Sequence, residues 1–171
     1  MPVKQLLVLR HAKSSWDDPD LTDFDRPLGP RGLKTAPLMG RELSRRGWLP
    51  DLALVSPAQR TRDTWRLVAD ELPGQVPVQF ADELYEAAAG VILARMRQVK
   101  ATSLLVIGHN PGLQHFALRL AGAGSDESVF KKIEAKFPTA ALARFTVEDD
   151  WLDLDFGGGR LTHCVRPKDL G

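Results

Sequence analysis

Histidine and arginine side chains follow three short apolar stretches of this sequence, at positions where they could bind and attack a phosphate. Arg10 and His11 come directly after "LLVL", Arg60 lies one helical turn beyond "LALVSP", and His109 follows "LLVIG". A neutral imidazole is a nucleophile that can accept a phosphoryl group. Guanidinium groups grip phosphoryl oxygens, and their charge lowers the pKa of a nearby imidazole.

The two histidines can divide the work of such a reaction. His11 would attack, while His109 would donate a hydrogen bond to the charge that develops on the phosphoryl oxygens. Each residue alone also fits a structural role or a solvated one, but together they favour chemistry. The set predicts phosphoryl transfer through a covalent phosphohistidine, with no metal and no other cofactor.

These side chains can meet only if the elements that carry them end at one edge of a sheet. Short apolar runs bounded by turn residues predict buried strands at 5–9, 52–55, 76–80 and 103–107. Helical spacing lies between and after them, at 31–47, 57–74, 88–99 and 111–124. Such alternation predicts an α/β fold with a mostly parallel sheet and helices on both faces. Ligands bind outside the carboxyl ends of such strands.

Turn and cap residues set the bounds of two predicted helices. Gly47 follows Arg45-Arg46 and is a plausible C-cap. Ser56 and Pro57 fit an N-cap and first helical position. Pro37, inside the first helical pattern, should kink that helix or mark its first turn.

The C-terminal third has a different pattern. Residues 139–147 and 151–156 alternate with period two, and "GGGR" then leads to 161–165. This pattern predicts a terminal antiparallel meander. The predicted fold class is therefore a three-layer α/β sandwich with an antiparallel C-terminal portion.

Length and composition predict one domain over residues 1–171. The formal net charge of +1 gives no general attraction to nucleic acid or to a membrane. The single cysteine, Cys164, excludes an internal disulfide. No apolar run is long enough to cross a bilayer, and the first residues do not resemble a signal peptide, so we expect a cytoplasmic protein.

Three motifs, "LVLRHAKSSW", "SPAQRTRDTW" and "VIGHNPGL", resemble the histidine phosphatase superfamily, in which an Arg-His pair follows the first strand. The short chain and "DRPLGPRG" are most similar to SixA-type phosphohistidine phosphatases. The motifs run from residue 6 to about residue 113, and "FPTAALARF" fits more loosely. The resemblance implies a phosphoglycerate mutase-like fold.

Carried over by position, the resemblance makes His11 the phosphorylated residue and places Arg10, Arg60 and His109 in the phosphate pocket. Arg26, in "DRPLGPRG", would face the substrate phosphate, as in SixA-type members. Its alternative is a loop arginine paired with a neighbouring aspartate. Arg62 should point away, since it lies two helical positions from Arg60.

The stretch after His11 departs from the pattern Arg-His-Gly-Glu-Ser-x-Trp-Asn of phosphoglycerate mutase-like members. Ser14 and Trp16 match, and Ser14 is a candidate substrate-binding residue. Asp17 replaces an asparagine that helps to bind phosphate, and because a carboxylate would repel a phosphoryl group, we do not assign it to the pocket. Lys13 replaces an acidic residue and either adds local positive charge or is simply exposed.

The general acid is also open. "LYEAAAG" places Glu86 at the position of the acid in many relatives, with Glu83 as a competitor. SixA-type members lack a clear acid here. An alkoxide leaving group needs a proton in the transition state, whereas an imidazole leaving group needs it less. Glu86 therefore either acts as the acid or caps a helix, and its role bears on the substrate.

Three functions remain in competition. The first is a phosphatase for phosphohistidine on a protein, such as a phosphotransfer domain, because little sequence remains to cover the site. The second is a phosphatase for small phosphomonoesters or polyphosphate, favoured by Glu86, Lys13 and Arg26. The third is a non-catalytic phosphate-binding module. In each case phosphate or sulfate should bind in the site.

Other polar and aromatic residues fit structural roles. The acidic loop at 17–25 is expected to be solvated, His115 to be packed or exposed, and His163-Cys164 too small a set for a metal. Thr139 either approaches the site or simply begins a strand. The tryptophans expected in or near the core are Trp48, Trp65 and Trp151.

Overall fold

The computed structural model describes residues 3–170. Its strands are β1 (Lys4–Arg10), β2 (Leu52–Val55), β3 (Val78–Phe80), β4 (Ser103–Gly108), β5 (Leu142–Val147) and β6 (Gly159–Val165). Its α-helices are α1 (Pro30–Arg46), α2 (Gln59–Ala69), α3 (Ala89–Met96), α4 (Gly112–Leu120) and α5 (Glu127–Ala135). No helix within this range is both long enough and apolar enough to cross a membrane.

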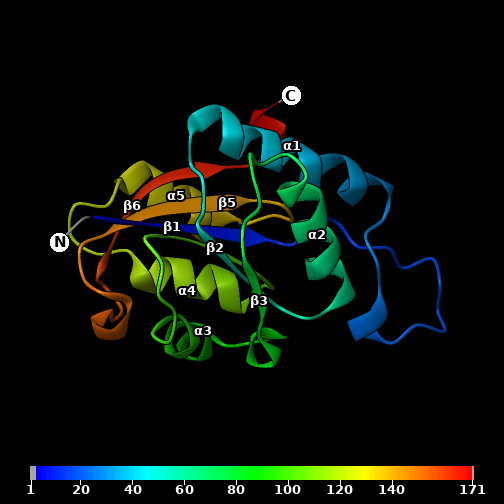
Figure 1. Ribbon diagram of the computed structural model, residues 1–171, viewed down its shortest axis with the longest axis horizontal. Coiled ribbons are helices and arrows are strands. Elements are labelled where there is room, and N and C mark those ends of the chain that lie inside the picture. The colour runs from blue at the N-terminus through cyan, green and yellow to red at the C-terminus, as the bar shows by residue number, and fades with distance from the viewer. Residues whose placement is uncertain (1–2, 171) are drawn as a thin grey trace.

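The strands form one mixed sheet in the order β3-β2-β4-β1-β5-β6 (Figure 1). β1, β2, β3 and β4 are parallel, while β5 is antiparallel to both of its neighbours, β1 and β6. The predicted parallel sheet with an antiparallel C-terminal portion is confirmed. β6 consequently runs in the same direction as β1.

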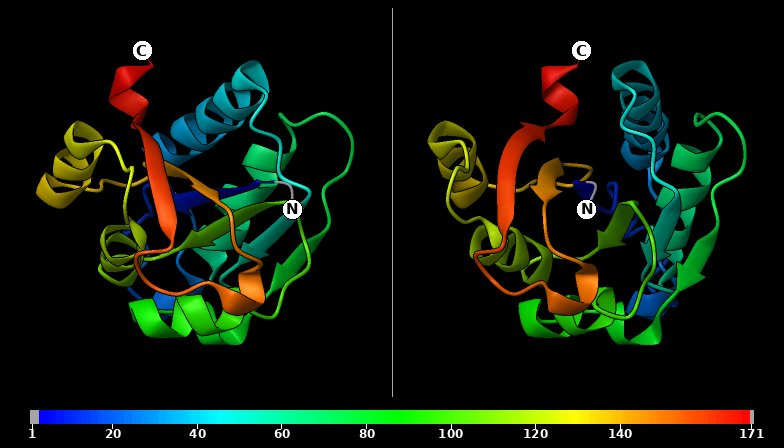
Figure 2. Two further views of the ribbon diagram at one scale, coloured as in Figure 1. Left: turned by 90° about the vertical axis from the view of Figure 1, so that its left-hand side faces the viewer. Right: turned by 60° about the vertical axis from the view of Figure 1, so that its left-hand side comes forward.

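Helices cover both faces of the sheet, which gives the predicted three layers (Figure 2). Side chains of β1 alternate between the layers, with Leu6 and Val8 on one face and Leu7 and Leu9 on the other. The first face packs against α3, α4 and α5, and the second against α1 and α2. Both faces of the central strands are thus buried, which explains why each of these strands contains an unbroken apolar run.

The carboxyl ends of the parallel strands lie at one edge, toward which the β1 arrowhead points in Figure 1. Leu9 pairs with Ile107 of β4, so Arg10 and Gly108 end their strands side by side. Val55 of β2 pairs with the same Ile107. The residues that follow these three strands are therefore held together by backbone pairing.

Two cap predictions have different outcomes. Gly47 ends α1 in the left-handed conformation, with a φ of 70°, as predicted. The prediction of Ser56 as the N-cap of α2 is wrong, since the N-cap is Ala58. The Ser56 hydroxyl instead contacts His109 in the site. Pro37 lies inside α1, beyond the first turn.

Two further segments differ from prediction. Residues 151–156 do not form a strand, because Trp151–Asp153 is a short 3-10 turn. The buried residues of this segment, Trp151 and Leu154, are three positions apart. A 3-10 turn places residues with this spacing on the same side. The helix α5 was not predicted, although Asp126 is a recognisable N-cap that accepts a hydrogen bond from the Val129 backbone N–H.

Candidate active site

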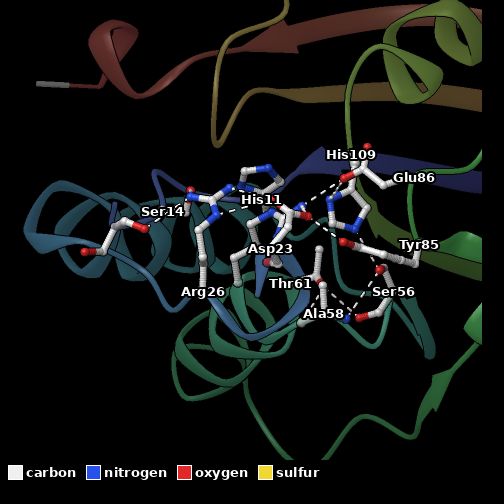
Figure 3. A network of polar contacts seen from close by, with 12 residues as sticks. His11, Ser14, Asp23, Arg26, Ser56, Ala58, Thr61, Tyr85, Glu86 and His109 are labelled. Carbon is white, nitrogen blue, oxygen red and sulfur yellow. Dashed lines mark hydrogen bonds and ion pairs between the residues drawn. The ribbon is translucent and has the colours of Figure 1, made fainter. Parts of the chain in front are cut away.

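His11 is held at the end of β1 by its backbone and its ring. Its backbone N–H donates to the Gly108 carbonyl. Its Nδ1 lies 2.7 Å from the Ala12 carbonyl oxygen. Since a carbonyl can only accept, Nδ1 carries the proton and Nε2 is left with a free lone pair. His11 is 7% exposed and lines the pocket, so Nε2 is suited to nucleophilic attack (Figure 3).

The surroundings of His11 keep its ring neutral. Burial, together with the positive charges of Arg60, Arg10 and Arg26, lowers its pKa to about 4, although the hydrogen bond to Ala12 acts in the opposite direction. Desolvation and nearby cations both disfavour an imidazolium ion. The ring is therefore deprotonated, and nucleophilic, across the physiological range.

The loop after His11 is fastened to α2. The Ala12 backbone N–H donates to Thr64 Oγ1 at 3.0 Å, and the Thr64 hydroxyl donates in turn to the Arg60 carbonyl oxygen at 2.7 Å. Both contacts are buried. They couple the position of the His11 ring to that of the helix that carries Arg60.

Asp23 binds both of the pocket's most buried arginines. Its Oδ1 accepts from Arg26 Nε and Nη2, at 3.3 and 3.2 Å. Its Oδ2 accepts from Arg60 Nη2 at 3.1 Å and from the Tyr85 hydroxyl. The hydrogen bond from Tyr85, with the charges of Arg60 and Arg26, lowers the pKa of Asp23 to about 2. One ionised carboxylate thus sets the orientation of two guanidinium groups.

Arg26 has further contacts that fix its plane. Its Nη1 donates to Ser14 Oγ at 2.7 Å and to the Ser15 carbonyl oxygen at 3.1 Å. Its guanidinium carbon lies 3.4 Å from the centre of the exposed Trp16 ring. Arg26 therefore both lines the pocket and pairs with a neighbouring aspartate, which combines the two alternatives raised by the sequence.

His109 faces His11 across the pocket, with ring centres 5.4 Å apart. Its Nε2 lies 2.7 Å from Ser56 Oγ, while its buried Nδ1 has no hydrogen-bond partner within residues 3–170. If the Ser56 hydroxyl donates, Nδ1 carries a proton that points toward the pocket. Burial, and after it the electrostatic effects of His11 and Arg60, lowers the pKa of His109 to about 3. His109 is thus a neutral donor.

Glu86 lies at the exposed side of the pocket. Its Oε1 accepts from Arg60 Nη2 at 2.9 Å and lies 3.8 Å from His109 Nδ1. The Glu86 backbone has a φ of 53°. The carbonyl oxygen of the next residue, Ala87, packs so closely against Gly112 that a side chain at position 112 would clash with it. Glu83 is not a competitor, because it pairs with Arg95 of α3 at 2.8 Å.

The structure brings the predicted residues into one open pocket of about 290 Å³. Its predicted members are Arg10, His11, Lys13, Ser14, Arg26, Arg60, Glu86 and His109. Arg10 Nη1 is anchored on the Phe137 carbonyl oxygen at 3.2 Å. Thr139 also lines the pocket. Asp17 is exposed and does not, as expected.

The remaining expectations concern residues outside the pocket. Arg62 points away, over the Phe80 ring at 4.7 Å. His115 is exposed, and the tryptophans Trp48, Trp65 and Trp151 are buried. Within residues 3–170, no three His, Cys, Asp or Glu side chains gather as a metal-binding group.

Three residues of the site were missed or misread in the sequence. Asp23 belongs to an acidic loop that looked merely solvated, Tyr85 sits beside Glu86 without a motif of its own, and Ser56 looked like a helix cap. The available signal for Asp23 was its position, three residues before Arg26, because such spacing suits an ion pair in a single turn.

Fold and site together define a class of protein. A sheet with helices on both faces places two neutral histidines and three arginines at the edge where its parallel strands end. This arrangement is suited to holding a phosphoryl group beside a nitrogen nucleophile. The chain belongs to the histidine phosphatase superfamily (branch 1), whose family model matches residues 6–113.

Relatives and solved structures agree with this family. An uncharacterized protein of Mycobacterium tuberculosis is 37% identical over 169 residues, which cover 94% of this chain and all of the relative. A structure from Nakamurella multipartitia, provisionally described as the phosphohistidine phosphatase SixA, is 29% identical and covers 98% of both chains, with a TM-score of 0.84. One from Agrobacterium tumefaciens, described in the same way, is 28% identical and covers 96% of this chain and 98% of its own, with a TM-score of 0.81.

The first prediction concerns the protonation of His11. Because burial and three arginines hold its pKa near 4, its ring should stay neutral from pH 8 down to about pH 5, in the Nδ1–H form. Histidine-ring ¹H–¹⁵N NMR over this range measures both properties, with His11→Ala assigning the signal. Protonation near the ordinary value of about 6.5, or a proton on Nε2, would contradict this description.

The second prediction concerns Asp23 as a positioning residue. Asp23→Asn keeps the side-chain shape but weakens its hold on Arg26 and Arg60, so turnover of a phosphate substrate should fall about tenfold. Inhibition by inorganic phosphate should not weaken, because the pocket gains one positive charge. Asp25→Asn is the matched control, since Asp25 accepts a side-chain hydrogen bond only from Thr22 within the described chain. Equal losses in both variants, or unchanged turnover in Asp23→Asn, would show that Asp23 does not position the arginines.

Proposed function

We propose that this protein is a metal-independent phosphatase that forms a covalent phosphohistidine on His11 and acts on phosphohistidine in proteins. The observation that carries the proposal is the 2.7 Å contact between His11 Nδ1 and the Ala12 carbonyl oxygen. It leaves Nε2 unprotonated, in a pocket where arginines can hold the phosphoryl oxygens. Membership of the histidine phosphatase superfamily supports the same chemistry.

In the first step, the Nε2 lone pair of His11 attacks phosphorus, and the phosphorus–nitrogen bond of the substrate breaks. The bonding electrons leave with the substrate imidazole, which departs neutral because its other ring nitrogen carries a proton or because the departing nitrogen receives one as the bond breaks. Arg10, Arg26 and Arg60 balance the charge of the equatorial oxygens, and His109 donates to one of them through Nδ1–H.

In the second step, water attacks the phosphorus of phospho-His11. The oxygen–phosphorus bond forms as the bond to Nε2 breaks, and inorganic phosphate leaves with one proton of the water passing to solvent or to a phosphate oxygen. His11 Nε2 regains its free lone pair, while Nδ1–H stays hydrogen-bonded to the Ala12 carbonyl oxygen throughout. The cycle needs no group beyond those in the pocket and one water molecule.

Two features support a protein substrate. The pocket is open at the sheet edge, and Glu86, at its rim, is 49% exposed on its side chain. A phosphohistidine on the surface of a folded protein could therefore reach Nε2. The similarity to the two SixA structures, at 29% and 28% identity, points to the same substrate class.

The placement of Glu86 favours a second candidate, a phosphatase of small phosphomonoesters or polyphosphate. Its carboxyl group lies in the pocket beside Arg60 and His109, where its protonated form could donate a proton to an ester leaving group. The same ion pair with Arg60 serves equally to orient that arginine. The two candidates share the nucleophile and differ in whether a proton donor is required.

The third prediction tests the nucleophile. His11→Ala should abolish trapping of ³²P on the protein from a phosphohistidine-containing phosphotransfer domain, and lower turnover by at least about a thousandfold. His115→Ala, which removes an exposed histidine outside the pocket, is the matched control and should label normally. Turnover that survives in His11→Ala would overturn the mechanism. Failure of the wild-type protein to take up ³²P from any phosphodonor would favour a non-catalytic phosphate-binding module.

The fourth prediction separates the two substrate classes. Glu86→Gln should leave hydrolysis of a phosphohistidine peptide within about threefold of wild type, because imidazole is a good leaving group. Hydrolysis of an alkyl phosphate, if it occurs, should fall by about a hundredfold, because the alkoxide then lacks its proton. Glu83→Gln is the control. Equal losses on both substrates would show that Glu86 acts through Arg60 and not as an acid.

A further inference from the structure

A second concavity, here called the basic groove, adjoins the catalytic pocket. It has a volume of about 150 Å³, and its charged lining residues are Arg31, Lys136, Arg166 and Lys168. The other lining residues are two threonines and two prolines, so no carboxylate lines it. Thr139 lines both the groove and the catalytic pocket, so the two are neighbours.

The sheet brings these cations to the edge that holds His11. Leu9 of β1 pairs with Leu142 of β5, which pairs with Val165 of β6. Arg166 therefore follows β6 at the level at which Arg10 ends β1. Lys136 lies in the segment that enters β5 at this edge, and Arg31 lies in the first turn of α1. Segments far apart in sequence thus supply a single patch of positive charge.

Most of this charge is uncompensated. Asp169 binds Arg166 with two contacts, at 3.1 and 3.2 Å, and so neutralises it. Within residues 3–170, the structure gives the side chains of Arg31, Lys136 and Lys168 no hydrogen bond and no ion pair. Three free cations around one concavity are attractive to an anionic partner.

Exposure distinguishes the groove from the catalytic pocket. Arg60 and Arg26 are 2% and 7% exposed and held in fixed orientations, as one phosphoryl group requires. Arg31, Lys136 and Lys168 are all exposed, on separate elements. Exposed, solvated cations of this kind suit several carboxylates spread over a protein surface better than one compact anion.

Trp16, in the catalytic pocket, offers a different contact. Trp16 lines that pocket, lies flat on Arg26 and is 70% exposed. Exposed aromatic rings beside a site are typical of protein interfaces. A macromolecule that delivers a group to His11 would therefore have Trp16 and the groove available for contact beside the catalytic pocket.

We propose that the basic groove binds acidic side chains that flank the phosphohistidine of the substrate protein. This inference rests on the proposed function and adds to it the chemical character of the partner: an acidic surface around the phosphorylated histidine. Long-range attraction to the three cations speeds encounter and selects among phosphohistidine proteins, while the catalytic pocket treats every phosphoryl group alike.

The fifth prediction uses two phosphohistidine peptides that are identical except for four flanking glutamates in one and four glutamines in the other. At about 0.05 M salt, wild-type kcat/KM should favour the glutamate peptide about tenfold, and the preference should shrink at about 0.5 M salt, where screening is strong. The preference should vanish in the triple variant Arg31→Glu, Lys136→Glu, Lys168→Glu, and weaken in each single variant.

Lys100→Glu is the matched control. Lys100 is an exposed lysine just before β4, at the opposite end of the strands from the groove. Reversing its charge should leave the preference for the glutamate peptide as in the wild type. Equal kcat/KM on both peptides in the wild type would overturn the groove's role while leaving the phosphatase function intact. So would a preference that persists in the triple variant.

Binding measurements keep the groove testable if the proposed function itself fails. Failure of the wild type to hydrolyse both peptides and free phosphohistidine would reject that function. Fluorescence anisotropy with the unphosphorylated peptides then decides: tighter binding of the glutamate peptide, lost in the triple variant, supports the groove, and equal binding overturns it. Inhibition by inorganic triphosphate that depends on the three cations, without any peptide preference, would show instead a second phosphate subsite.

Discussion

Three guanidinium groups surround a buried neutral imidazole, and the repulsion among them has to be offset for the site to hold its shape. Asp23 does most of this, because its two oxygens bind Arg26 and Arg60 and its pKa lies far below the physiological range. Glu86 adds a second carboxylate on Arg60. Burial, helped by the same positive charges, keeps the His11 ring neutral. The arginines that would attract a phosphoryl group thus also contribute to the neutrality needed for attack.

The sheet converts this electrostatic arrangement into fixed geometry. Backbone pairing of Arg10 with Gly108 sets the start of the His11 loop beside that of His109. Side chains then complete the positioning: Ala12 directs the His11 ring, and Ser56 directs that of His109. Because these contacts are buried, water competes with them little, and both rings are held before a substrate arrives.

The edge of the sheet also separates two uses of positive charge. Arg26 and Arg60, at the proposed reaction centre, are buried and hydrogen-bonded, whereas three cations of the basic groove, Arg31, Lys136 and Lys168, are exposed and unpaired within the described chain. Buried charges give orientation at a single point, and exposed ones give long-range attraction that salt can screen. Both sets lie at one edge because β6 runs in the same direction as β1, so that the two strands end at the same edge of the sheet.

The sequence alone determined the sheet core, the edge that carries the pocket and most of the residues that line it, because apolar runs that end in His or Arg are local patterns. It did not reveal α5, whose single buried residue, Ile133, gives little periodic signal, and it misread 151–156 as a strand. Ser56 looked like a helix cap and Asp23 like a solvated loop residue. Only the tertiary structure decided their roles, because the partners that define them, His109 and Arg60, lie 53 and 37 residues away along the chain.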